Sequence, residues 1–369
     1  MKTLVLLVLC LLATSCSRQN ARQESEGINI DLTSDTEKAP LTHNDAMTIH
    51  GWIALDTCEQ ALLPSLQKIE KHDNRFFILD RVHQKGVVVF DEKGKYLYRI
   101  GKQGQGPGEY PDIYDFTIDR RSNRVVILSP ASSANVYTCE GEFLDAHREL
   151  DPTLLWNLTR TEDGYLMSTN HQTYTEGENA YLLYCFDNDF RLKWKDIPVY
   201  KKQISMSAST LLSSALQAIG NCTYYCDSPN YRIYSTGSDK GELRQAFDIS
   251  LKNPAPVEVF TDPMAFMQHQ REYSFITECA ITERWLILHY VDKGQMKFAL
   301  VDRENGNIVR NGAYQGVVLK MFYLGDNLFA SPVTAEEYLT YWSKQPVPQP
   351  QMSPDAEDNM LLLLWSPKA

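Results

Sequence analysis

The chain has 369 residues, 43% of them hydrophobic and 22% charged, a balance typical of a globular protein and not of a disordered one. The 36 Lys and Arg against 47 Asp and Glu give a net charge of -11, which argues against nucleic acid as a partner. The length suits one large β-domain or two ordinary domains, and 20 Tyr, 14 Phe and 6 Trp favour a β-rich fold over a helical bundle.

The N-terminus has the pattern of an export signal. Lys2 precedes an apolar run over 4–13, about half of the roughly 20 residues needed to span a bilayer. Leu12-Ala13-Thr14-Ser15-Cys16 resembles the lipobox of bacterial lipoproteins, in which the cysteine is lipidated and becomes the mature N-terminus. We therefore predict a signal peptide over 1–15, lipidation of Cys16 and a flexible polar tether over 16–27. The alternative is a secreted protein cleaved at the same bond.

A repeated strand pattern follows. Each copy has an apolar strand, a gap, a second strand, a turn that carries Gly or Asn, and a third strand; Gly and Asn tolerate the positive φ of tight hairpins. The turns fall near residues 94, 141, 189, 241 and 306, so the first four are 47 to 52 residues apart. The first strands of the copies are 76–80, 125–128, 165–167, 231–234 and 285–288. This period is typical of a β-propeller, in which each copy forms one blade.

Strand-like segments at both ends of the chain predict how the ring closes. Residues 48–55 and 359–365, together with 321–323 and 327–330, would form one composite blade. A ring closed by strands from both termini has no free sheet edge, which removes an aggregation hazard. Five copies plus this blade predict one all-β domain, a six-bladed β-propeller over 28–369. Seven blades stay open, and a two-sheet sandwich is the second choice.

Three stretches interrupt the strand pattern. Residues 208–219 have apolar side chains at helical spacing and predict a short amphipathic helix, with a distorted strand pair as the alternative. Residues 332–342 contain Thr334-Ala335-Glu336-Glu337, which indicates a helix start. Residues 344–358 carry four prolines and predict an extended surface loop.

The most distinctive local sequence is the glycine-rich string over 100–110. It does not fit a phosphate-binding loop, because a proline lies within it and an extended segment, not a helix, follows. We interpret it as a structural loop that crosses from the outer strand of one blade to the inner strand of the next. The residues of that loop are Gly101, Gly104, Gly106, Pro107 and Gly108.

Such a crossing runs toward the propeller axis, so Glu109 and Tyr110 are candidate ligand-binding residues at the rim of the central channel. The alternative is that Glu109 only caps a turn or meets an arginine of the next blade. Asp115 and Asp119 follow on one face of a strand. That face is either solvated or lines the channel mouth together with Glu109.

These features together resemble the six-bladed β-propeller lipoproteins abundant in Bacteroidota, which are similar in shape to NHL-type and TolB-like propellers. The resemblance rests on Cys16, on Phe90-Asp91-Glu92-Lys93-Gly94-Lys95 and on the string 100–110. It extends to Asn230-Tyr231-Arg232-Ile233-Tyr234 and to Asp358-Asn359-Met360, where Pro is usual in place of Met. It implies a propeller in the cell envelope, anchored by lipid to the outer membrane and facing the periplasm or the cell surface. The family has no agreed activity, so no catalytic residue is implied.

Residues that carry chemistry form no recognisable motif. The sequence has no Gly-x-Ser-x-Gly elbow and no His-Glu-x-x-His helix, and none of its eight histidines pairs at ligand spacing. His289 is interpreted as a core histidine because apolar residues precede it. The six cysteines after Cys16 are interpreted as buried small hydrophobes. We predict no catalytic residue, no metal and no cofactor.

Two functions are therefore open. The first is a non-catalytic binding or scaffold protein, held at the membrane by its lipid, whose propeller face binds a glycan, a peptide or a protein. The second is a hydrolase or lyase whose channel carboxylates and histidines come together only in three dimensions. Convergent polar side chains in the channel would favour the enzyme, and an apolar channel would favour the binding protein.

Overall fold

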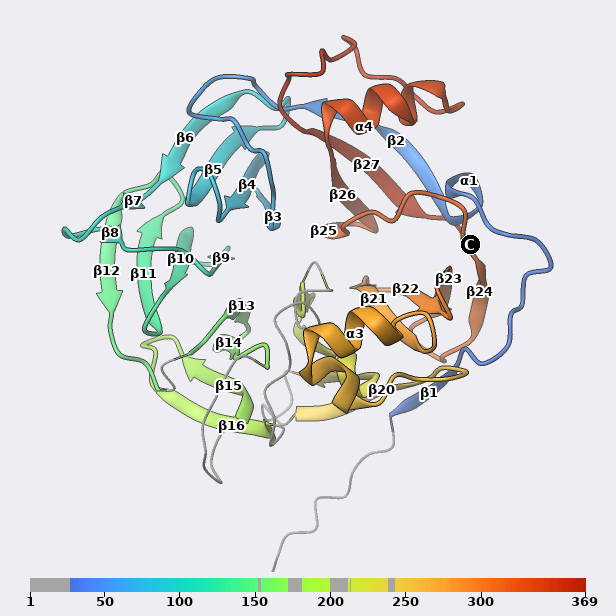
Figure 1. Ribbon diagram of the computed structural model, residues 1–369. Coiled ribbons are helices and arrows are strands. Elements are labelled where there is room, and N and C mark those ends of the chain that lie inside the picture. The colour runs from blue at the N-terminus through green and yellow to red at the C-terminus, as the bar shows by residue number, and fades with distance from the viewer. Residues whose placement is uncertain (1–26, 152–153, 172–180, 200–211, 213, 238–242) are drawn as a thin grey trace, which may run out of the picture.

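The computed structural model describes residues 27–151, 154–171, 181–199, 212, 214–237 and 243–369. Six sheets are arranged around a central axis like the blades of a propeller (Figure 1), which confirms the all-β, six-bladed fold. The structure does not describe residues 1–26, which include the predicted signal peptide, Cys16 and most of the tether. The predictions made for them stay predictions.

Each blade is an antiparallel sheet whose strands follow one another from the axis outward. The strands of blades 1, 2 and 3 are β3 (Lys68–His72), β4 (Arg75–Asp80), β5 (Gly86–Asp91) and β6 (Tyr96–Ile100); β9 (Asp115–Asp119), β10 (Arg124–Ser129), β11 (Ser133–Thr138) and β12 (Phe143–His147); β13 (Asn157–Thr161), β14 (Gly164–Ser168), β15 (Tyr181–Asp187) and β16 (Leu192–Pro198).

Blades 4 and 5 continue the pattern, and blade 6 combines both ends of the chain. Their strands are β17 (Leu216–Ile219), β18 (Cys222–Asp227), β19 (Arg232–Thr236) and β20 (Leu243–Ser250); β21 (Ser274–Ile281), β22 (Trp285–Asp292), β23 (Gln295–Asp302) and β24 (Ile308–Ala313); β25 (Phe322–Gly325), β26 (Leu328–Val333), β27 (Leu361–Pro367) and β2 (Met47–Ala54). A further strand, β1 (Ile28–Asp31), pairs in parallel with β20 at the outer edge of blade 4 and was not predicted.

Blade 6 confirms the predicted closure of the ring. β2, from the front of the chain, pairs antiparallel with β27, the last strand, and β27 pairs on its other side with β26. Trp365 of β27 is fully buried, donates from Nε1 to the Ser331 hydroxyl at 2.8 Å, and stacks on Phe329 with ring centroids 4.7 Å apart. The terminal strand is therefore held by packing as well as by its ladder.

The repeated turns join the third and fourth strands of a blade. Gly94, at the first of them, has φ +86, and a Cβ there would lie 2.1 Å from the Ala54 carbonyl oxygen of β2, so this turn requires glycine. Five blades share a β-bulge after this turn, at the junction of the same two strands. In blade 4, residues 232–234 of the predicted first strand 231–234 belong to the third strand, β19, and Gly241 lies outside the described residues.

The predictions for the three stretches that interrupt the strand pattern have different outcomes. The helix predicted over 208–219 is wrong where the structure describes it, because Leu216–Ile219 is strand β17, whose pairing with β18 outweighs the helical spacing. The predicted helix start is confirmed: Thr334 caps α4 (Ala335–Thr340) through a capping box with Glu337. The other helices of the described residues are α1 (His43–Ala46), α3 (Pro263–His269) and the 3-10 turns η1 (Ser228–Asn230), η2 (Val257–Thr261) and η3 (Trp342–Lys344). Residues 345–360, which hold the prolines, form no helix or strand.

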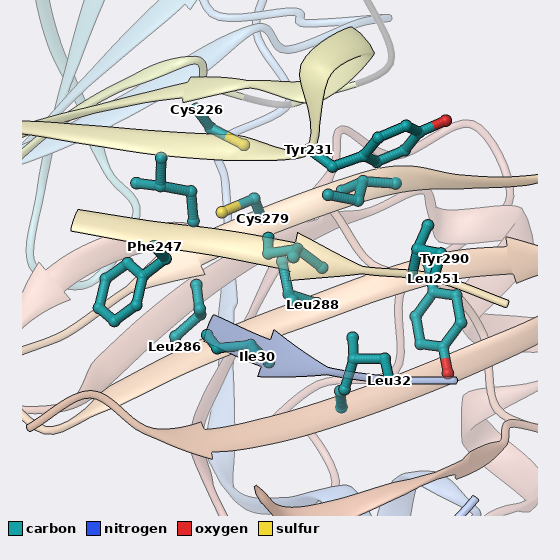
Figure 2. Packing of buried hydrophobic residues seen from close by; sticks show 14 of the residues in the cluster. Ile30, Leu32, Cys226, Tyr231, Phe247, Leu251, Cys279, Leu286, Leu288 and Tyr290 are labelled. Atoms are coloured by element: carbon teal, nitrogen blue, oxygen red, sulfur yellow. The ribbon is translucent and has the colours of Figure 1, made fainter. Parts of the chain in front are cut away.

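Apolar side chains fill the spaces between blades. Figure 2 shows one such cluster, in which Ile30 of β1 and Phe247 of β20 pack with Leu286 and Leu288 of blade 5. His289 lies in the neighbouring core beside Phe298 and Tyr314, and burial lowers its pKa to about 4, as expected of a core histidine. The six cysteines of the described chain are unpaired, and four of them are buried.

Removal of β27 is expected to unfold the protein. Leu361, Leu362, Leu363 and Trp365 are almost fully buried, and each such side chain contributes about 1.5–3 kcal/mol, so their sum rivals the roughly 5–15 kcal/mol of a typical domain. Deletion of 359–369 should abolish the cooperative thermal transition seen by circular dichroism. Deletion of 368–369 alone is the control and should melt like the parent; a full deletion that also does so would contradict the closure.

Candidate functional site

The inner strands of the six blades enclose an axial channel with three consecutive cavities. The cavity where these strands begin has a volume of about 210 Å³ and is named the mouth here; it is lined by residues such as Arg81, Tyr114, Trp156 and Lys320. A middle cavity of about 90 Å³ shares Lys68 with the mouth, and a far cavity of about 310 Å³ shares Arg160 with the middle one. Within the described ranges, no cluster of His, Cys, Asp and Glu is arranged to hold a metal ion.

A buried ion pair joins three blades beside the mouth. Lys68 Nζ of β3 lies 3.1 Å from Asp115 of β9 and donates to the backbone carbonyls of Phe116 and Leu158, at 2.6 and 2.9 Å. Asp115 in turn accepts from the Leu158 N–H of β13 at 2.7 Å. Burial raises the pKa of Asp115, and the Lys68 ammonium opposes that shift. We name these two side chains the clamp.

Two further ion pairs lie in the channel. Arg160 contacts Asp119 at 3.2 Å, and Arg120 contacts Glu70 at 3.4 Å. Asp115 and Asp119 therefore share one face, as predicted, but that face is buried against the channel, and its interpretation as a solvated face is wrong. The channel is polar, and its carboxylates are largely neutralised by neighbouring cations.

The mouth also holds a stacked aromatic pair. Tyr114 and Trp156 occupy equivalent positions directly before β9 and β13, where their N–H groups bond to Leu128 and Ser168 at 2.8 Å and extend each ladder by one residue. Their ring centroids are 4.4 Å apart, with 29° between the planes. Both side chains are half-buried and line the cavity.

Arg81 lies against this pair. The Asp80 carboxylate accepts three N–H bonds at 2.8–3.0 Å from the residues over 82–84, which fixes the turn after β4. From that turn the Arg81 guanidinium reaches 4.6 Å from the Trp156 ring and 5.6 Å from the Tyr114 ring, and donates to the Ile113 carbonyl. Burial lowers its pKa, yet an arginine stays charged at neutral pH.

The structure places the glycine-rich loop at the periphery of the ring. Glu109 and Tyr110 form β8, which pairs with β7 (Lys102–Gln103) beside the outer strand β12 (Figure 1), and none of the channel cavities is lined by either residue. Glu109 contacts Lys102 at 2.8 Å and accepts from the Gly106 N–H, and the Lys102 ammonium lowers its pKa. Tyr110 is fully buried and donates to the Ile100 carbonyl. A ligand role for the two residues stays a prediction.

A second polar cluster lies in blades 3 and 4, next to the mouth. His171 Nε2 lies 3.1 Å from an Asp227 carboxylate oxygen and 3.3 Å from the Tyr225 hydroxyl. All three side chains are buried, and Asp227 has no exposed surface. The neighbour of His171, Asn170, lines the mouth cavity.

Sequence reasoning missed Arg81, Trp156 and Lys320. Trp156 stands just before β13, a short polar strand that escaped the search for apolar runs, whereas Lys320 stands just before the predicted segment 321–323. The signal that could have found these residues is position: counting back from the second strand of a blade by one hairpin leads to Trp156 and Lys320, and Arg81 directly follows the second strand of blade 1.

Loss of the clamp is expected to destabilise the fold strongly. Replacing Lys68 with Met leaves the Asp115 carboxylate buried without a cation, which costs about 3–5 kcal/mol in unfolding free energy at neutral pH. Because burial already raises the pKa of Asp115, acidification should relieve this cost as the carboxyl becomes protonated, and so should the double variant Lys68→Met/Asp115→Asn.

Urea unfolding at several pH values measures these differences. Arg121→Met is the matched control, since Arg121 pairs with Glu162 at an exposed site where an ion pair contributes about 0–1 kcal/mol. Equal destabilisation by Lys68→Met and Arg121→Met would contradict a structural role for the clamp.

Comparison with known proteins agrees with this fold. No curated protein sequence matches the chain. A solved structure of a protein described as exported, from Bacteroides fragilis, is similar over 93% of this chain and 100% of its own, with a TM-score of 0.73 and 18% identity. A member of the DUF4221 family from Bacteroides vulgatus is similar over 88% of this chain and 99% of its own, with a TM-score of 0.60 and 11% identity.

At such identities the two structures show the fold alone. A family model described as a domain of unknown function, DUF4934, matches residues 27–364, which is nearly the whole propeller from β1 to the last strand. The chain belongs to the DUF4934 family.

Proposed function

We propose that this protein is a lipid-anchored envelope protein that binds a ligand at the channel mouth without catalysing a reaction. The observation that carries the proposal is the stacked Tyr114–Trp156 pair with Arg81 against it, at the edge of a cavity. Half-buried aromatic rings beside a few fixed polar groups are characteristic of binding sites.

The polar side chains that line the channel are compatible with a binding function. Polar side chains converge there, which on its own would favour an enzyme, but the carboxylates of the clamp and of the Arg160–Asp119 pair are held by cations. A carboxylate whose oxygens are engaged by a cation and by backbone N–H groups, as in Asp115, is a poor general base, because these bonds compete with an incoming proton. These groups are better explained as fixing the inner strands.

A hydrolase or lyase is the second candidate, and the His171–Asp227–Tyr225 cluster favours it. A histidine held by a carboxylate beside a tyrosine hydroxyl is a combination suited to proton transfer. Against it, the three side chains are buried, so a substrate at the mouth would not contact them. A His171→Gln variant that turns over a substrate as fast as the parent protein would exclude this cluster as the catalytic group.

The proposed location rests on the sequence and on similarity. Cys16 ends a lipobox-like string after a short apolar run, and the similar protein from Bacteroides fragilis is described as exported. In the described part of the chain, no helix is long and apolar enough to cross a membrane. Lipid at Cys16 would anchor the chain there, provided that more than one acyl chain is attached.

Replacement of Cys16 by Ser is expected to release the protein from membranes. The acyl chains would be absent, and the altered chain should move to the soluble fraction when cells are broken and fractionated. Ser17→Ala is the control and should stay with membranes. Sedimentation of Cys16→Ser with membranes would show that the anchor lies elsewhere.

Binding at the mouth is expected to depend on Trp156. An array of glycans and peptides probed with the protein from residue 17 onward should reveal ligands whose capture falls about thirtyfold or more in Trp156→Ala, since a buried aromatic anchor contributes about 2 kcal/mol or more. Glu109→Gln, in the peripheral loop, is the control and should bind normally. Melting temperatures verify that both variants are folded. Capture lost only in Glu109→Gln would place the site at the loop instead.

A further inference from the structure

We propose that the ligand of the mouth is an acidic saccharide, whose ring stacks on Trp156 and whose anionic group contacts Arg81 and Lys320. This inference rests on the proposed function, that the mouth binds a ligand, and adds its chemical class. It comes from the juxtaposition of one aromatic platform with two cations that have no carboxylate partner.

The cations of the mouth differ in how they are paired. Lys68 is neutralised by Asp115, whereas neither Arg81 nor Lys320 has a carboxylate within ion-pair distance anywhere in the described chain. Lys320 is exposed and donates from Nζ to the Leu66 carbonyl at 3.1 Å, and Arg81 donates only to a carbonyl as well. Besides Asp115, the acidic residue of the lining is Glu278. The mouth is therefore lined by more cations than carboxylates, in a protein whose net charge is -11.

Cations without a carboxylate partner at the wall of a cavity favour an anionic ligand. A carboxylate or sulfate group would replace their lost hydration with charge-assisted hydrogen bonds, which are about twice as strong as neutral ones. Arg81 is especially suited, because its guanidinium is already oriented by the Trp156 ring and less conformational freedom is lost on binding. Because the protein as a whole is negatively charged, an anion is expected to bind where cations locally outnumber carboxylates, as they do at the mouth.

Trp156 is the aromatic platform of the mouth. The Arg81 guanidinium carbon lies 4.6 Å from the centre of the Trp156 ring, and the centre of the Tyr114 ring lies 4.4 Å from it. If the two groups lay on directly opposite faces of Trp156, they would be about 9 Å apart. Their separation is 5.6 Å. They therefore do not enclose Trp156 from directly opposite faces, and Trp156 lines the same cavity as Arg81 and Lys320. The C–H groups on one side of a sugar ring pack well against such an aromatic face.

The mouth suits a single sugar ring in its size and in its hydrogen-bonding groups. At about 210 Å³ the mouth is smaller than the roughly 300–1,000 Å³ of sites for drug-sized ligands, which suits one sugar ring with the rest of a chain outside. Asn157 accepts from Ser168 through its carbonyl oxygen, which leaves its NH2 group without a partner among described residues. The Ser214 hydroxyl donates to the Leu216 carbonyl and can still accept. Amide and hydroxyl groups at a cavity wall match the hydroxyls of a sugar.

Isothermal titration calorimetry tests the inference on the protein from residue 17 onward. The probes are oligosaccharides that carry uronic acid, sialic acid or sulfate, each beside its neutral counterpart, such as trigalacturonic acid beside its full methyl ester. Comparing the carboxylated with the sulfated members separates the two sources of anionic charge. At least one acidic probe should bind at least about tenfold more tightly than its neutral counterpart, and its affinity should fall as salt is raised.

Variants locate the anionic contact. Arg81→Gln and Lys320→Gln should each weaken binding of that probe about tenfold or more, whereas Lys102→Gln, which removes the same charge at the periphery, should leave it unchanged. Because Arg81→Gln also loses the contact with Trp156, its melting temperature is compared with that of the parent, and Lys320→Gln provides an independent variant at an exposed site.

The outcomes separate this inference from the proposed function. A neutral glycan or a peptide whose binding depends on Trp156 but not on Arg81 and Lys320 would overturn the acidic saccharide and leave the mouth as a binding site. Binding that no mouth variant affects would overturn both. If no acidic probe binds, the inference is wrong whatever else the array captures.

Discussion

The pairing of β2 with β27 is the constraint on which the molecule depends, because it joins the two ends of the chain within one blade. A propeller without this pairing would leave β27 with an open edge and blade 6 without its outermost strand. Each blade packs on its neighbours through apolar faces, so closing the ring fixes the positions of all six inner strands. The channel and its mouth exist only because the inner strands are held in this circle.

Polar side chains at the centre have two distinct roles in this account. The clamp ties blades 1, 2 and 3 together through one ammonium group and one carboxylate, and every donor and acceptor there is engaged with protein groups. Arg81 and Lys320 line the same cavity as the clamp, yet they donate only to backbone carbonyls. Buried charges paired within the protein fix geometry, whereas unpaired charges at a cavity are free to recognise a ligand.

The sequence predicts the outer parts of each blade better than the inner ones. Middle strands such as 76–80 and 86–90 are buried on both faces, so they read as apolar runs and reveal the repeat. Inner strands face a polar channel, and Lys68–His72 and Asn157–Thr161 show no such run. Trp156 precedes the second of these strands and was missed for the same reason, whereas Arg81 and Lys320 adjoin apolar segments that were recognised. Glu109 was expected near the axis because its loop connects blades, but the loop turns back on Lys102 at the periphery before the chain crosses.

Hydrogen–deuterium exchange with and without the tightest acidic saccharide tests most directly the claim that the mouth is the binding site. Amide groups over 113–115 and 155–158, which carry Tyr114 and Trp156 and form ladder bonds at the channel, should exchange more slowly when the saccharide is present. Amides over 101–110 in the peripheral loop should be unchanged. Protection confined to the peripheral loop, with none at the mouth, would contradict the account.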